Sequence, residues 1–181
     1  AGGQVFGGAA FGRTTALAGA SRARDRALVV LLAGSGLRIG EALGLSVSDV
    51  DFLRRTVRVE RQRLRSGNLG PVKTARSART VPLGQVVIDE LAAHLAAWPP
   101  TPSGVGRPVE VTPSSEGVTE GALFTDDLGE PLSYRGWASI WVRANTSLKL
   151  DVDTHQLRHF YASALISGGA SVKVVQARLG H

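Results

Sequence analysis

The spacing of apolar residues predicts a mainly helical domain with a small antiparallel sheet. In residues 21–34 and 85–98, apolar side chains recur with the period of an amphipathic helix. In residues 56–63 they alternate with polar side chains, which is the period of a half-buried strand. Residues 71–83 can supply two further strands, joined by a turn near Ser77. Further helices are predicted over residues 38–43, 134–144, 155–166 and 171–178.

Other segments lack such a period. Residues 1–20 are rich in glycine and alanine, so we predict a linker or a disordered lead-in there. Residues 66–70 are predicted to form a loop, and residues 99–121, rich in Pro, Gly and Ser, a long surface loop. Residues 122–124 are predicted to form a short buried strand. The chain would then consist of a lead-in over residues 1–20 and one domain over residues 21–181.

Composition places the chain among globular proteins. Its 181 residues suffice for one domain with a hydrophobic core, and no apolar run reaches the ~18 residues that span a bilayer. The absence of cysteine excludes disulfides and cysteine-ligated metals. No secretion signal is evident, so we expect a cytoplasmic protein.

The charge of the chain favours a polyanionic partner. The formal net charge is +6, and most of the basic residues are arginines; the lysines are Lys73, Lys149 and Lys173. A basic balance of this size is typical of proteins that bind nucleic acid, although many basic domains do not.

Two short motifs place cationic side chains where one ligand could reach them. His155 and Arg158 are three residues apart on a predicted helix, so both project from one face. Arg38 precedes Glu41 by the same spacing, and the glycines around it leave room for the backbone of a large ligand. A solvated helix face and a local ion pair would produce the same spacings, so both motifs also have a structural interpretation.

Lys73 lies in the predicted sheet, with Arg76 and Arg79 close to it in the sequence. These arginines are candidate DNA contacts, and the whole segment could be a basic hairpin that lies along DNA phosphates.

The arginines, the lysine and the histidines together form a coherent set for phosphate chemistry. Guanidinium groups bind the non-bridging oxygens of a phosphate bidentately and stabilise a pentacoordinate transition state. A lysine or a histidine can protonate the leaving oxygen. Such a site needs no metal, and residues 125–130 hold the carboxylates that keep a magnesium site conceivable.

Four motifs in order resemble the tyrosine recombinase family, which includes phage-type integrases. They are GLRIGEALGL, VKTARSARTVPL, THQLRHFYASALISGG and VQARLGH, and the resemblance extends over residues 21–181. It implies the family's catalytic-domain fold, the DNA breaking-rejoining enzyme type, which is mainly α with a small antiparallel sheet insertion.

The resemblance assigns roles to single residues. Arg38 and Arg158 match the two arginines that grip the scissile phosphate, and Lys73 matches the general acid toward the leaving 5′ hydroxyl. His155 matches a residue that handles protons and contacts the phosphate. The other two matches are His181, a further phosphate contact, and Glu41, which supports the first arginine.

The nucleophile of the family is a tyrosine shortly after the histidine that matches His181. The chain has two tyrosines: Tyr161 matches a position in the packed interior of its helix, and Tyr134 has a packing or surface role as its simplest interpretation. We therefore expect a catalytic domain that is incomplete at its C-terminus, lacks the nucleophile and is inactive alone.

The leading hypothesis is the catalytic domain of a bacterial or phage-encoded site-specific recombinase that acts on double-stranded DNA without cofactors. The family implies a homotetramer on DNA for the full-length protein, whereas this chain should be monomeric. Two alternatives stay open: a non-catalytic DNA-binding module with a phosphate clamp, and a metal-independent phosphodiesterase that uses a histidine directly.

Overall fold

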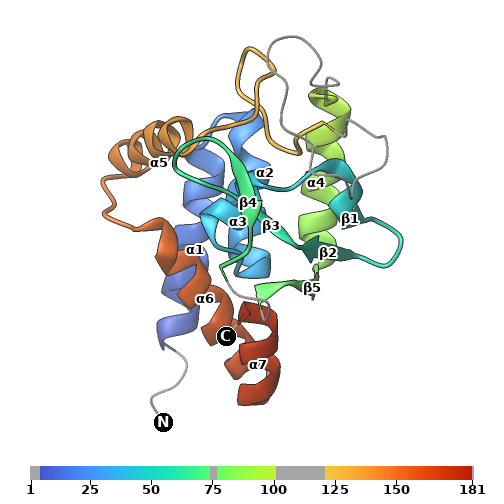
Figure 1. Ribbon diagram of the computed structural model, residues 1–181. Helices are drawn as coiled ribbons and strands as arrows, with labels where there is room; N and C mark the ends of the chain where they lie inside the picture. The colour runs from blue at the N-terminus through green and yellow to red at the C-terminus, as the bar shows by residue number, and fades with distance from the viewer. Residues whose placement is uncertain (1–4, 74–76, 101–120, 181) are drawn as a thin grey trace.

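The computed structural model describes residues 5–73, 77–100 and 121–180, and their arrangement is shown in Figure 1. The predicted fold class is confirmed, because helices surround small antiparallel sheets. The elements in chain order are α1 (Val5–Ala20), α2 (Ala23–Ser35), α3 (Ile39–Leu43), the 3-10 helix η1 (Val47–Asp49), β1 (Val50–Asp51), β2 (Thr56–Val59), β3 (Arg61–Arg63), β4 (Leu69–Pro71), β5 (Arg79–Pro82), α4 (Gln85–Ala97), α5 (Tyr134–Leu148), α6 (Thr154–Ser167) and α7 (Val172–Leu179).

Helix α2 is the centre of the hydrophobic core. Leu28, Leu31 and Leu32 are buried on it, and it packs against α1, α4 and α6. Each fully buried leucine side chain contributes roughly 1.5–3 kcal/mol. The helix ends at Gly36, whose φ of 65° lies in the left-handed region that glycine adopts without strain. This turn directs the chain into the segment that carries Arg38.

The sheet region differs in part from the predicted strands. The strand predicted over residues 56–63 is divided: β2 pairs with β1 and β5, whereas β3 pairs with β4 in a separate hairpin. The loop predicted over residues 66–70 is shorter, because Leu69 and Gly70 belong to β4. A tight turn explains this, since the backbone N–H of Leu64 donates to the carbonyl of Asn68 at 2.8 Å.

Residues 1–20 were expected to be a linker or a disordered lead-in, and within them the structure has helix α1. Leu17 and Ala18 are buried, and α1 packs against α2, α5 and α6. Alanine favours a helix but the glycines of this segment disfavour one, and its apolar residues follow no clear helical period. The hydrophobic pattern therefore did not predict this helix.

The segment around Phe124 is buried as predicted but does not form a regular strand. Ala122 makes an isolated bridge to Ser46, and the N–H of Leu123 donates to the carbonyl of Leu45 at 2.9 Å. Residues 101–120 of the predicted surface loop lie outside the described residues. In the described part of the chain, no helix is long and apolar enough to cross a membrane.

Candidate active site

Arg38 lies at the N-terminus of α3, where Glu41 holds it from two directions. The backbone N–H of Arg38 donates to Glu41 Oε2 at 2.9 Å, and its guanidinium Nη1 donates to Glu41 Oε1 at 3.0 Å. The Arg38 side chain remains 37% exposed, whereas that of Glu41 is only 2% exposed. The guanidinium is therefore fixed at one end and accessible to a ligand.

Glu41 is also paired with Arg79, whose side chain is 6% exposed. Arg79 Nη2 donates to Glu41 Oε2 at 2.9 Å, and Nη1 donates to Oε1 at 3.2 Å. Burial alone would raise the pKa of Glu41, but the hydrogen bonds and charge of Arg79, with those from Arg38, hold it below its usual value. Glu41 is therefore an anion that fixes two arginines.

The sequence suggested Arg79 as a DNA contact, which would require an exposed side chain. In the structure this side chain is buried. Its Nε donates to the carbonyl of Arg178 at 2.7 Å, and its Nη1 also donates to the carbonyl of Ser77 at 2.8 Å. The physical reason is Glu41, a buried carboxylate that requires a cationic partner. Arg79 thus joins α3, β5 and the end of α7.

Arg158 extends from α6 into the same region and is 5% exposed. Its Nη1 donates to the carbonyl of Gly36 and its Nη2 to that of Leu179, each at 2.6 Å. Burial, and then the positive charge of Arg38, lower the pKa of Arg158 to about 10, although Glu41 opposes this shift. The guanidinium is still protonated at neutral pH, and an anion beside it would relieve the repulsion from Arg38.

His155 is exposed one turn before Arg158. Its ring lies edge-on to that of His159, with 4.8 Å between the ring centroids. His155 and Arg158 both line the pocket described below, as their spacing on one helix face predicted.

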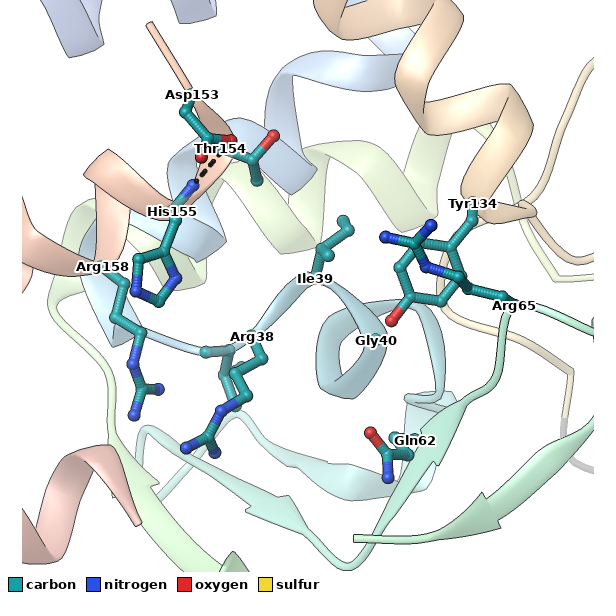
Figure 2. Close-up of a pocket in the computed structure, with 11 residues that line it drawn as sticks. Arg38, Ile39, Gly40, Gln62, Arg65, Tyr134, Asp153, Thr154, His155 and Arg158 are labelled. Carbon is teal, nitrogen blue, oxygen red and sulfur yellow. Dashed lines mark hydrogen bonds between the residues drawn. The ribbon is translucent and has the colours of Figure 1, made fainter. Parts of the chain in front are cut away.

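An open pocket of about 290 Å³ brings these side chains together. Figure 2 shows Arg38, His155 and Arg158 on one side of it and Gln62, Arg65 and Tyr134 on the other. We call these the arginine side and the hairpin side. The lining residues are Leu37, Arg38, Ile39, Gly40, Gln62, Arg65, Tyr134, Asp153, Thr154, His155 and Arg158.

Lys73, Arg76 and His181 are the other residues that the sequence suggested for the site. Lys73 is exposed just after β4, and it is not among the described residues that line the pocket. Arg76 and His181 lie outside the described residues. Helix α7, which precedes His181, is held at its C-terminal end by Arg79 and Arg158.

Gln62, Arg65 and Tyr134 are polar residues of the pocket that no sequence motif marked as site residues. Their place depends on how the β3–β4 hairpin packs on α3, where Arg63 Nε donates to the carbonyl of Leu43 at 3.2 Å. For the hairpin, the sequence signal is the alternation of arginines in residues 61–65, which continues the strand period beyond β2.

Tyr161 is buried against Val175 and Leu179, in agreement with the predicted core role. Arg178 Nη1 lies 3.5 Å from its hydroxyl oxygen, and its ring fills the space above Gly36. A Cβ on Gly36 would come within 2.4 Å of that ring, so Tyr161 helps to fix the turn before Arg38.

The arginine side is suited to bind a phosphodiester. Two guanidinium groups and an imidazole converge on an open pocket, and the bonds of Arg38 and Arg158 to the protein fix them before a ligand arrives. Among the described residues, no group of three His, Cys, Asp or Glu side chains is placed to hold a metal ion.

Fold and site together define a mainly helical domain with an arginine-lined pocket. The sequence profile of the phage integrase family matches residues 13–181, so the chain belongs to this family. This confirms the resemblance to tyrosine recombinases seen in the sequence motifs.

The curated relatives include two named tyrosine recombinases. The chain is 34% identical over 160 residues to tyrosine recombinase XerD of Corynebacterium glutamicum, which covers 87% of the chain and 44% of that protein. It is also 34% identical over 160 residues to tyrosine recombinase XerC of Pelotomaculum thermopropionicum, covering 87% of the chain and 46% of the relative. The chain thus spans somewhat less than half the length of these relatives.

Solved structures of recombinases share the fold. The Tn1549 transposon integrase in complex with circular intermediate DNA aligns with a TM-score of 0.70 at 24% identity, covering 87% of this chain and 51% of that one. XerA recombinase aligns with a TM-score of 0.68 at 20% identity, and the alignment covers 94% of this chain and 53% of that one. The predicted catalytic-domain fold is therefore confirmed.

Proposed function

We propose that this chain is the catalytic domain of a site-specific DNA recombinase that cleaves and rejoins DNA through a phosphotyrosine intermediate. The observation that carries the proposal is the convergence of Arg38, His155 and Arg158 on one open pocket. Membership of the phage integrase family supports it.

In this proposal Arg38 and Arg158 bind the two non-bridging oxygens of the scissile phosphate. Negative charge grows on these oxygens as phosphorus becomes pentacoordinate, and guanidinium groups that are already fixed stabilise it without reorganisation. Glu41 keeps Arg38 oriented through its two hydrogen bonds. It acts as a positioning residue and not as a reactant.

The proton steps fall to the other cations. The attack of a tyrosine oxygen on phosphorus breaks the bond to the 5′ oxygen, which must gain a proton as it leaves. We assign this proton to Lys73, whose exposed position after β4 suits a group that approaches DNA. His155 contacts the phosphate and handles a proton, and we assign a further phosphate contact to His181.

Neither tyrosine of this sequence suits the nucleophile. Tyr161 is buried in the core. Burial raises the pKa of Tyr134, with opposition from Arg65, which makes its oxygen harder to ionise. We therefore propose that the nucleophile lies outside these 181 residues, in the full-length protein, and that the chain alone does not cleave DNA.

The partners are part of the same proposal. We propose that the full-length protein binds double-stranded DNA as a homotetramer and that it acts in the cytoplasm of a bacterium. Structural neighbours in complex with DNA support the DNA partner. We further propose that the coding sequence originates from a phage or prophage. Attachment sites that flank the coding sequence would test this origin.

The decisive experiment uses the full-length protein and nicked duplexes that carry its binding site, selected from a random-sequence pool. A nick beside the cleavage point releases the 5′ end and traps the covalent adduct. The recombinase should become linked to DNA, and Arg38→Ala or Arg158→Ala should abolish the adduct. Site binding without an adduct would instead indicate a binding module, and cleavage without an adduct would indicate a phosphodiesterase.

A further inference from the structure

The hairpin side of the pocket has a chemistry of its own. Arg65 lies in the turn between β3 and β4, and its guanidinium carbon is 5.9 Å from the centroid of the Tyr134 ring. In Figure 2 the Arg65 side chain crosses the Tyr134 ring, whose hydroxyl points toward Gly40. The stacking orients Arg65, and its exposed guanidinium can still donate hydrogen bonds to a ligand.

Gly40 allows the Tyr134 hydroxyl to take this place. A Cβ at Gly40 would lie 2.2 Å from that oxygen and 3.1 Å from the carbonyl oxygen of Arg63. The hydroxyl therefore rests on the first turn of α3, the helix whose N-cap residue is Arg38. Burial raises the pKa of Tyr134, so its hydroxyl keeps its proton at neutral pH and can donate a hydrogen bond.

Gln62 completes this side of the pocket and holds the hairpin in place. Its Nε2 donates to the carbonyl of Pro71 at 3.0 Å, which links β3 to β4. Arginine, tyrosine and glutamine are all residue types that contact phosphate oxygens in protein–DNA complexes. The carboxylate that lines the pocket, Asp153, lies at the start of α6, on the arginine side.

The pocket is also larger than one phosphate requires. Its volume of about 290 Å³ corresponds to roughly ten water molecules in the liquid. Each DNA strand carries one phosphate per about 3.4 Å of helix axis, so a strand that places one phosphate between Arg38 and Arg158 brings a neighbouring phosphate with it.

We infer that Arg65 and Tyr134 form a subsite for the backbone phosphate next to the one held by Arg38 and Arg158. This subsite rests on the proposed function, because it takes the arginine side as the position of the scissile phosphate. Its ligand is a second phosphodiester of the same strand, bound without regard to base sequence. Arg65 supplies charge and Tyr134 a neutral hydrogen bond.

The test compares two small probes on the 181-residue chain by calorimetric titration at low salt. Thymidine 3′-monophosphate carries one phosphate, and thymidine 3′,5′-bisphosphate carries two at the separation of adjacent backbone phosphates. The bisphosphate should bind more tightly. Arg65→Ala should weaken bisphosphate binding about fivefold, the effect of one exposed charge contact, and Tyr134→Phe about threefold, the effect of one neutral hydrogen bond. Neither variant should change monophosphate binding.

Arg54→Ala is the matched control, because it removes an exposed arginine from the β1–β2 turn. It should leave the ratio of the two affinities unchanged. The subsite is overturned by a chain with no preference for the bisphosphate, or by a preference that survives both Arg65→Ala and Tyr134→Phe. If Arg38→Ala leaves monophosphate binding unchanged, the phosphate grip of the proposed function fails instead.

Discussion

The arginine side and the hairpin side of the pocket are held in place in different ways. Arg38 and Arg158 are bonded to Glu41 and to backbone carbonyls at the ends of α2 and α7. Arg65, in contrast, is exposed on a turn and rests on one aromatic ring. A group that stabilises a transition state benefits from being fixed in advance, whereas a group that only binds a strand can adapt.

The largest expected effect comes from removing the anion of the arginine side. Glu41→Ala leaves the buried guanidinium of Arg79 without its carboxylate, and we expect a loss of about 4 kcal/mol in the free energy of unfolding. Glu60→Ala, which removes an exposed carboxylate, should change it by less than about 0.5 kcal/mol. Urea denaturation measures both, and equal losses would contradict the distinct role of Glu41.

The next largest effect distinguishes the buried Arg79 from the exposed Arg65. Arg79→Ala should cost about 3 kcal/mol in unfolding free energy, because it leaves Glu41 with only one cationic partner. It should also speed amide hydrogen exchange in α7, whose Arg178 carbonyl loses its donor. Arg65→Ala should alter neither quantity. Unchanged exchange in the Arg79 variant would show that α7 does not depend on this contact.

A smaller effect addresses the hairpin side. Gly40→Ala should cost about 2 kcal/mol, because the new methyl group collides with the Tyr134 hydroxyl and displaces the ring. In a Tyr134→Phe background the cost should fall, although the contact with the Arg63 carbonyl remains. A double-mutant cycle measures this coupling. Additive effects would mean that the two residues do not share this space.

The smallest expected effect is on how the free energy of unfolding depends on pH. The pKa of Glu41 is lower in the folded protein than its ordinary value of 4.5, so its stabilising effect is complete above about pH 4.5 and is lost as the pH falls through the lowered pKa. Unfolding of Glu41→Gln should therefore depend less on pH below 4.5 than unfolding of the unmodified chain. If the free energy of unfolding had the same pH dependence in both proteins, ionised Glu41 would not be the source of that dependence.

The sequence predicted the parts that depend on local pattern and on short motifs. The apolar period located α2 and α4, the helices α3, α5, α6 and α7 were also predicted, and the motifs pointed to Arg38, His155 and Arg158. Helix α1 was missed because a helix of small residues carries little apolar contrast.

Two parts of the site depend on tertiary contacts that no local pattern contains. Arg79 is buried because of Glu41, which lies 38 residues earlier in the chain. Arg65 and Tyr134 meet only because the β3–β4 hairpin packs near the start of α5. Neither pairing has a periodic or motif signal, so the sequence suggested Arg79 as a DNA contact and Tyr134 as a packing or surface residue.

The central claim is that Arg38 and Arg158 act together as one phosphate grip. It is tested most directly by following the Nε–H resonances of the arginines in nitrogen-labelled protein while thymidine 3′-monophosphate is added. The signals of Arg38 and Arg158 should shift and saturate together, while that of the exposed Arg54 should not move. Shifts of equal size at Arg54, or none at Arg38 and Arg158, would contradict it.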